Sequence, residues 1–273
     1  MNSKIKISIV TPSYNQGAFL ERTIKSVIDQ KHPNIEYIII DGGSTDNSVD
    51  IIKKYKDEVD YWVSENDSGQ YDAIKKGFKK ATGDVLCWIN SDDILLPGSL
   101  NHISNIFENC PNIDVVYGNI YYIDKFDNIV KDMRNTPLVK SGYLYKAGFG
   151  FSQPEVFWRN SLYNKVGGID SSGQFAMDYD LFFKFIKAGA KFKHTRVHLS
   201  ALRFYEGTKT SKISHIGLKE NQAIRNKIFL GNSIIFRIVL RLCVWPVKIV
   251  HYILQGDTSW LIKHFMQKIR ILK

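Results

Sequence analysis

The first half of the chain alternates short apolar, often β-branched runs with stretches in which apolar residues recur at helical spacing. This alternation is typical of βαβ units, in which helices connect the parallel strands of one sheet. The sequence therefore predicts an α/β fold with a mainly parallel central sheet flanked by helices. We expect strands at 6–10, 37–40, 61–63 and 85–89, a turn at 11–17, and helices over 20–28, 51–55, 74–81 and from Pro97 onward.

After residue 113 the pattern changes to strand-like segments joined by tight turns. Strands at 115–119, 121–124 and 129–133, with a turn at 126–128, predict a meander at the edge of the sheet. Helical spacing returns at 178–187.

Composition and cysteine content limit the class of protein. With 44% hydrophobic and 23% charged residues among 273, the chain is not a disordered, collagenous or disulfide-scaffold protein. Cys87, Cys110 and Cys243 are too few, and odd in number, for a disulfide framework, which indicates a reducing compartment. The first ten residues lack the pattern of a signal peptide, so we expect a cytoplasmic protein.

Positive charge is concentrated at the carboxyl end. The formal net charge is +10, and residues 221–273 hold nine basic side chains and one acidic one, Asp257. The first 220 residues are close to neutral, so this part has no general attraction for a polyanion. We therefore expect no nucleic-acid partner for the globular part.

Four segments that follow predicted strands are unusually polar: 11–15, 41–46, 64–69 and 90–93. In open α/β sheets, ligands bind outside the carboxyl ends of the strands. Any one of these segments is more often an ordinary turn or helix cap, because Asx and Ser residues favour both. Four of them at one edge favour a binding site.

Asp92 and Asp93 follow an apolar strand and have no Lys or Arg within seven residues on either side. Adjacent carboxylates without a cation repel one another, so a hard divalent ion is the natural partner. Mg²⁺ or Mn²⁺ held by one or two carboxylates commonly takes substrate phosphates as further ligands, which points to a nucleoside diphosphate. The alternative is a solvated turn ahead of the helix that begins near Pro97.

Three runs together resemble family 2 glycosyltransferases of the GT-A fold: 10–15 (VTPSYN), 40–46 (IDGGSTD) and 88–93 (WINSDD). The resemblance spans about residues 5–211 and continues in order through 64–65, 67–73, 153–154, 166–170 and 177–181. It implies a Rossmann-like GT-A domain with a small acceptor-side subdomain. It also implies transfer of a sugar from a nucleotide-sugar donor with inversion at the anomeric carbon.

The resemblance also implies roles for individual residues. Asp41 would hydrogen-bond the base, Asn90 would lie toward the ribose, and Asp92, with Asp93 beside it, would hold Mn²⁺ or Mg²⁺. The donor, expected to be a UDP-sugar, would be bound by Thr11, Pro12, Ser13, Tyr14, Asp41, Asp67, Gly69, Asn90 and Ser91.

Asp178 matches the acidic residue that serves as catalytic base in this family. Inversion by direct displacement needs one carboxylate beside the acceptor hydroxyl to take its proton as the new bond forms. Asp180 is the second candidate, and capping of the helix at 178–187 is the structural alternative for Asp178.

The chain departs from the family pattern at three places. A single acidic residue, Asp41, follows the second strand, Asn90 replaces the first Asp of the metal motif, and no His follows Arg203. These departures leave the number of protein ligands to the metal open. Lys209 and Lys212 are candidates for closing over the diphosphate, although such loops are usually solvated surface.

The tail from 221 to 273 has the pattern of an interfacial helix. Residues 234–254 are long enough to span a membrane, but they contain Arg237, Arg241 and Lys248, each of which costs about 3 kcal/mol near the centre of a span. These residues and His251 fall on one stripe, as in helices that lie on anionic membranes. A second such stretch covers 261–272, and packing on the catalytic domain or on a second subunit is the alternative.

The sequence thus predicts a catalytic domain at 1–220, with a donor half (1–113) and an acceptor half (114–220), followed by the tail. The expected function is an inverting, metal-dependent glycosyltransferase of surface polysaccharide synthesis, peripheral to the inner face of the plasma membrane, with a glycan or lipid-linked glycan acceptor. One alternative is a sugar nucleotidyltransferase, whose Gly-rich triphosphate loop the first turn lacks. The other is a protein without enzymatic activity that binds nucleic acid or membrane through the tail.

Overall fold

The computed structural model describes residues 4–138, 151–169, 176–205, 217, 219–220, 223–224 and 234–263. Two compact units are formed: residues 1–135 with 151–224, and residues 136–150 with 225–273. The expected donor half (1–113) falls within the first unit, and so does the expected acceptor half (114–220) except for residues 136–150. Lys209 and Lys212 lie outside the described residues.

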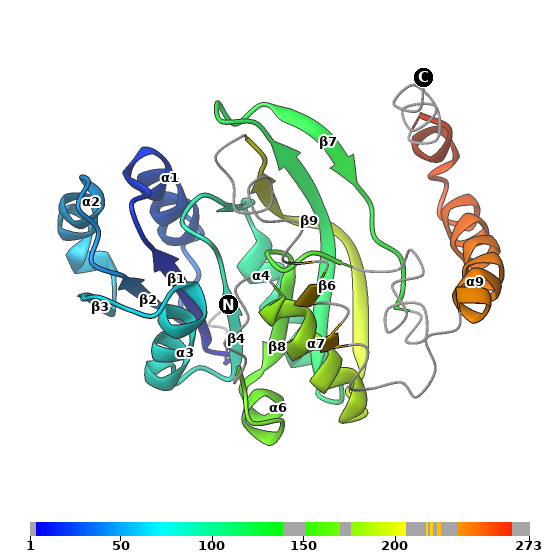
Figure 1. The fold of residues 1–273 in the computed structure, drawn as a ribbon, viewed down its shortest axis with the longest axis horizontal. Helices are drawn as coiled ribbons and strands as arrows, with labels where there is room; N and C mark the ends of the chain where they lie inside the picture. The colour runs from blue at the N-terminus through cyan, green and yellow to red at the C-terminus, as the bar shows by residue number, and fades with distance from the viewer. Residues whose placement is uncertain are drawn as a thin grey trace. The chain divides into compact units, whose positions relative to one another are not determined.

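The amino-terminal part of the first unit confirms the predicted βαβ pattern (Figure 1). Strands β1, β2, β3 and β4 are parallel neighbours in the order β3-β2-β1-β4. The expected turn at 11–17 is wrong at its start, because Thr11 to Ser13 continue β1 and pair with Ile39 to Asp41 of β2. The elements are β1 (Ile7–Ser13), α1 (Gly17–Ile28), β2 (Ile35–Asp41), α2 (Ser48–Lys54), η1 (Lys56–Glu58), β3 (Tyr61–Ser64), α3 (Gln70–Lys80) and β4 (Val85–Trp88).

The sheet continues through strands of mixed direction in the order β4-β8-β6-β9-β5, with β7 paired to β6. The predicted edge meander is wrong in two respects: residues 115–123 form one continuous strand, and that strand lies between β8 and β9 inside the sheet. The remaining elements are β5 (Ile94–Leu95), α4 (Ser99–Asn109), β6 (Val115–Ile123), β7 (Ile129–Met133), β8 (Val156–Arg159), α6 (Asn160–Lys165), α7 (Met177–Lys187) and β9 (Phe192–Arg203).

Alternation along the buried strands divides the core between the two faces of the sheet. On one face, Ile9 of β1 packs in the same apolar cluster as Ile24 of α1 and Phe107 of α4. On the other face, an aromatic cluster joins α3 to the sheet, with Phe78 centred 6.1 Å from Trp88 and 5.7 Å from Trp158. Both faces of this part of the sheet are therefore covered by packed helices.

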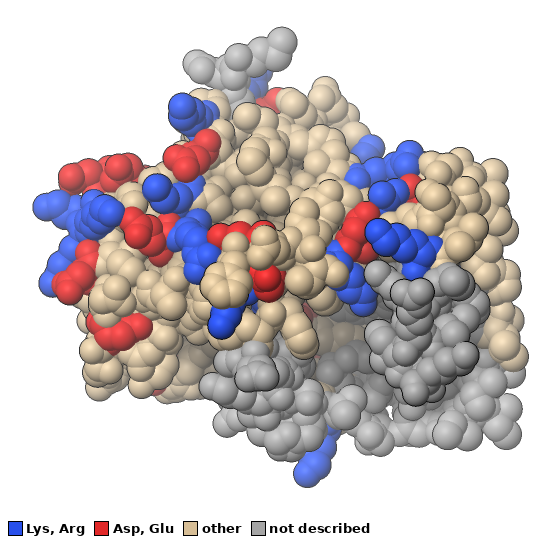
Figure 2. Space-filling view, turned by 90° about the horizontal axis from the view of Figure 1, so that it is seen from above, with Lys and Arg blue, Asp and Glu red and all other residues tan. Residues whose placement is uncertain are grey.

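Charged side chains on the first unit are interspersed. Figure 2 shows basic and acidic side chains alternating over the amino-terminal half of the molecule, on the left. This mixture agrees with the near neutrality of the first 220 residues.

In the second unit, α9 (Ile234–Leu254) confirms the first predicted tail helix and includes Pro246. Tyr252 is buried, and its ring lies 4.8 Å from that of Trp260. Apolar side chains elsewhere on α9 are open to solvent, with Leu242 69% exposed and Ile253 52% exposed. Among the described helices, none combines the length and apolar character needed to cross a membrane.

Candidate active site

The carboxyl ends of four parallel strands meet at one edge of the sheet and form one side of a cavity of about 840 Å³. The other side comes from the segment before β8, the start of α7 and the end of β9. The structure thus brings together segments up to 192 positions apart, from Pro12 to Phe204. The predicted site residues that line the cavity are Pro12, Ser13, Tyr14, Asp67, Gly69, Asn90, Ser91, Asp92, Asp93 and Asp178.

Two predicted donor-binding residues, Thr11 and Asp41, are fully buried behind this lining. The Thr11 hydroxyl lies 3.1 Å from that of Tyr37. The Asp41 carboxylate accepts hydrogen bonds from the amide and hydroxyl of Ser44 and from the hydroxyl of Ser64, 2.6 Å away. Asp41 therefore braces the loop after β2, and its contact with a base stays a prediction.

Asp67 stands at the cavity edge against the loop after β2. Gly42 allows this approach, because a Cβ there would lie 2.7 Å from an Asp67 carboxylate oxygen. The other oxygen accepts a hydrogen bond from the amide of Gly69, whose φ of 108° favours glycine. Partial burial raises the pKa of Asp67, with Asp72 and Asp41 acting in the same direction.

A chain of amide hydrogen bonds fixes the orientation of Asn90. Gln70 Nε2 donates to Asn90 Oδ1 at 2.7 Å, and Asn90 Nδ2 donates to Asp93 Oδ2 at 3.0 Å. Gln153 stands beside them and donates to the main-chain oxygen of Trp88. The Asn90 amide oxygen is thereby engaged by a protein donor.

Asp92 and Asp93 have different environments although they are adjacent. Asp93 is 2% exposed, and its second carboxylate oxygen accepts the main-chain amide of Arg203 at 2.8 Å. Asp92 is less buried and lines the cavity, where its carboxylate interacts with the hydroxyl of Tyr205. The guanidinium of Arg203 binds the main-chain oxygen of Asp92, at 2.8 Å from Nε.

Burial raises the pKa of the Asp92 carboxyl, against the opposing effect of Arg203. The pKa of Asp93 is raised further, first by burial and then by the charge of Asp92. The pair is therefore costly to ionise and attracts positive charge. No group of three or more His, Cys, Asp or Glu side chains suited to a metal ion occurs among the residues described.

Asp178 lies in the first turn of α7 and lines the cavity, as the predicted base should. One of its oxygens accepts the amide of Tyr179 at 2.7 Å. The N-cap of α7 is Ala176, which makes no side-chain cap, so the capping alternative for Asp178 is wrong. Asp180 lies 3.3 Å from Lys184 Nζ in an ion pair. Asp178 lines the cavity and Asp180 is not part of its lining, so position favours Asp178 as the candidate base.

Several site residues were missed from the sequence. Gln70 looks like an ordinary first-turn helix residue. Tyr205 lies just beyond β9, a strand that periodicity did not reveal, and Arg203, which ends β9, was noted only as part of the family pattern and given no role at the site. Glu155 is completely buried beside the cavity, where its carboxyl accepts hydrogen bonds from the Ser152 amide and the Asn135 side chain. Its other oxygen has no hydrogen-bond partner in the part of the chain that the structure describes, and burial raises the pKa of Glu155 to about 8.

We expect Glu155→Gln to remove a pH dependence of stability, because Gln has the shape of the protonated acid. An unfolded Glu titrates near 4.5, so between that value and about 8 the folded wild type binds the extra proton. Its free energy of unfolding then falls as pH rises, by at most about 1.4 kcal/mol per pH unit, and levels off above the folded pKa. Urea unfolding at several pH values measures this. The free energy of unfolding of the variant should rise relative to that of the wild type as pH increases across this window. If the two free energies change with pH in parallel, the raised pKa of Glu155 is wrong.

The chain is similar to known proteins both through a family model and through single relatives. The model of the family described as Glycosyl transferase family 2 matches residues 8–168. An uncharacterized glycosyltransferase of Rickettsia typhi is 27% identical over 195 residues, which cover 67% of this chain and 59% of that protein. One from Mycobacterium tuberculosis is 42% identical over 94 residues, 34% of this chain and 36% of that protein. The chain spans less than two thirds of the length of these relatives.

Two solved structures share the fold. TarS of S. aureus, residues 1–349 in complex with UDP-GlcNAc, superposes with a TM-score of 0.63 at 19% identity, covering 76% of this chain and 61% of that one. The mannosyltransferase PcManGT of Pyrobaculum calidifontis, in complex with GDP-Man and Mn²⁺, gives 0.56 at 16% identity, covering 80% and 61%.

Proposed function

Because the chain belongs to glycosyl transferase family 2, and its fold matches GT-A glycosyltransferase structures, we propose that it transfers a sugar from a nucleoside diphosphate sugar to an acceptor hydroxyl. One observation carries the proposal: a single cavity is lined by Asp67, Asp92 and Asp178, which come from three separate segments. These groups are suited to the nucleoside, the cation and the acceptor, respectively.

For the donor we propose a UDP-sugar. TarS is solved with UDP-GlcNAc and PcManGT with GDP-Man, so both relatives in fold hold a sugar nucleotide. Tyr14, which is 61% exposed and lines the cavity beside Pro12, offers a ring to the base. The cavity volume of about 840 Å³ is sufficient for a sugar nucleotide.

For the cofactor we propose Mn²⁺ or Mg²⁺, held through Asp92. The donor set fits a hard cation, because the Asp92 carboxylate lines the cavity and has no ion-pair partner within the described residues. Asp93 stays the second candidate ligand, although both its oxygens already accept protein hydrogen bonds. A bound cation would act as a Lewis acid on the departing diphosphate.

We propose inversion by a single displacement, with Asp178 taking the proton of the acceptor hydroxyl. Asp178 is well placed for this role because it begins a helix whose buried residues, among them Phe182 and Phe185, anchor it in the core. A rigidly held carboxylate loses little freedom when the substrates bind.

The fastest test of function is a thermal-shift panel of nucleoside diphosphates and nucleotide sugars with and without Mn²⁺. Ligands that bind the folded state raise the melting temperature, so we expect a UDP-sugar with Mn²⁺ to give the largest rise. A response to nucleoside triphosphate with sugar phosphate would favour a nucleotidyltransferase. Failure of every sugar nucleotide to shift the melting temperature would contradict the proposal.

For the acceptor we propose a lipid-linked glycan of surface polysaccharide synthesis, reached at the inner face of the plasma membrane through the tail. The exposed apolar side chains Leu242, Val250 and Ile253 share one side of α9 by their spacing, and the helix is also rich in basic residues. This combination suits a surface of anionic lipid.

We expect Ser at positions 242, 250 and 253 to weaken binding to anionic liposomes by about tenfold or more, because apolar area is lost from the interface. Flotation of the full chain measures this. Ser at Ile129 and Val130, which are similarly exposed on β7, is the matched control and should leave binding unchanged. If a chain truncated after Asn221 still floats, the tail is not the anchor.

A further inference from the structure

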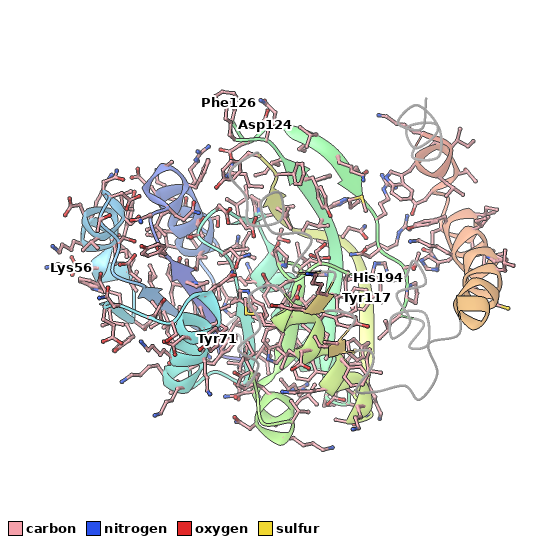
Figure 3. All side chains as sticks on the ribbon, viewed as in Figure 1. Lys56, Tyr71, Tyr117, Asp124, Phe126 and His194 are labelled. Atoms are coloured by element: carbon pink, nitrogen blue, oxygen red, sulfur yellow. The ribbon has the colours of Figure 1, made fainter. Side chains whose placement is uncertain are left out.

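The turn between β6 and β7 is tied directly to the acidic segment of the cavity. Figure 3 shows Asp124 and Phe126 at the tip of this hairpin. Asp127, in the same turn, lies 2.5 Å from Nη1 of Arg203. The same Nη1 donates to the main-chain oxygen of Asp124 at 2.8 Å, so two groups of the turn hold one end of the guanidinium.

The other end of Arg203 supports the acidic pair. Its Nε donates to the main-chain oxygen of Asp92, and its own amide donates to the Asp93 carboxylate, each at 2.8 Å. The Arg203 side chain has 0% exposure, so its charge is not screened by water. Its Nη2 is buried and has no partner among the described residues. The guanidinium therefore has one amino group, with two N–H donors, still unpaired among the described residues, and the carboxylates of Asp92 and Asp93 lie nearby.

We propose that Asp127 positions Arg203 so that the guanidinium supports the main chain of Asp92 and leaves the Asp92 carboxylate available to a divalent cation. This inference rests on the proposed metal-dependent function and adds a positioning residue to it. Asp127 also places a negative charge against the buried guanidinium of Arg203, which contacts the acidic segment. Without that charge, Arg203 would be drawn toward Asp92 and would compete with the metal.

Arg22 gives the proposal a matched control. Asp127 Oδ2 also pairs with Arg22 Nη1 at 2.9 Å, and Arg22 binds the main-chain oxygen of Lys125 in the same turn. Both guanidinium groups lie over the ring of Phe19, at 5.1 Å for Arg22 and 4.8 Å for Arg203. Within the described residues, the polar contacts of Arg22, on α1, are with this turn and with Ala18 and not with Asp92 or Asp93. Its loss should therefore loosen the turn without redirecting the guanidinium of Arg203.

Asp127→Asn is the informative variant, because Asp127 has a φ of 72° and Asn tolerates this left-handed conformation well. The change keeps the turn and removes the charge. We expect it to weaken Mn²⁺ binding on the order of tenfold, as couplings within one charge network commonly do. Binding of UDP without metal should stay the same, and Asp127→Glu, which keeps the charge, should recover part of the loss. Arg22→Gln should change Mn²⁺ affinity by less than about twofold, as expected for a partly exposed pair.

The full-length protein is titrated with Mn²⁺ in the presence of excess UDP, with GDP in a parallel series, and free Mn²⁺ is followed by its electron paramagnetic resonance signal. Weakened binding in Asp127→Asn but not in Arg22→Gln supports the inference. Equal binding by wild type and Asp127→Asn overturns it, and so does equal weakening in both variants, which would indicate a loosened turn. Failure of the wild type to bind Mn²⁺ with either nucleotide overturns the metal assignment and this inference together.

Discussion

Asp178→Asn is expected to reduce sugar transfer by about 10² to 10⁴-fold, the usual contribution of a general base. Asn has the shape of Asp but cannot take the proton of the acceptor hydroxyl. The loss should fall on kcat, while donor binding stays near wild type, because the residues proposed to hold the nucleoside come from the opposite side of the cavity. Release of nucleoside diphosphate under saturating donor measures kcat, and the thermal shift with donor measures binding.

Asp180→Asn is the matched control for this experiment. Asp180 lies two residues further along α7, and its carboxylate pairs with Lys184 at 3.3 Å. Its substitution should therefore cost far less activity than that of Asp178. A larger loss in Asp180→Asn would transfer the role of base to Asp180, and near-normal transfer by Asp178→Asn would exclude Asp178.

Asp92→Asn is expected to abolish the Mn²⁺-dependent part of the donor thermal shift and to lower transfer by about a hundredfold or more, because the cation loses its leading carboxylate ligand. The fold should survive, since Arg203 binds the main-chain oxygen of Asp92 and not its side chain. The melting temperature without metal should accordingly stay close to wild type. Calorimetry with UDP and Mn²⁺ checks the affinity directly.

Asp93→Asn separates metal binding from folding. Both Asp93 oxygens accept hydrogen bonds, from Asn90 and from the Arg203 amide, in a site that is 2% exposed. An Asn side chain offers one acceptor where two are needed, so this variant should lose about 1 to 3 kcal/mol of stability without metal. If Asp92→Asn lowered the melting temperature as much as Asp93→Asn, the division of roles between them would be wrong.

The donor side of the site was predictable because its signals are local. Each of β1 to β4 is an apolar run followed by polar residues, and parallel strands bring such ends to one edge regardless of register. The same reasoning predicted that Asp41 lies in the cavity. The sequence could not show that Ser44 and Ser64 donate hydrogen bonds to its carboxylate.

The acceptor side was less predictable because its contacts span long separations. Strand β9 carries both polar and apolar residues, and its pairing with β5 and β6 depends on segments some 80 to 105 residues away. Arg203 consequently reaches Asp92 across 111 positions and meets Asp127 from another strand pair. Periodicity carries no information about such contacts, so the sequence predicted a turn at 126–128 and no role for it at the site.

The hydrogen bond from Gln70 to Asn90 affects how the protein would bind a cation. Position 90 is an Asn where the family's metal motif has an Asp, so the protein offers the ion one negative charge fewer than that motif would. The Asn90 amide oxygen also accepts a hydrogen bond already. Most of the coordination must therefore come from the diphosphate and water. We expect the ion to arrive already complexed to the incoming substrate and to leave with the spent nucleotide. The rate of turnover would then depend on the concentration of the complex between the metal ion and the nucleotide sugar. It would therefore respond to cellular magnesium or manganese and to the supply of activated sugar together.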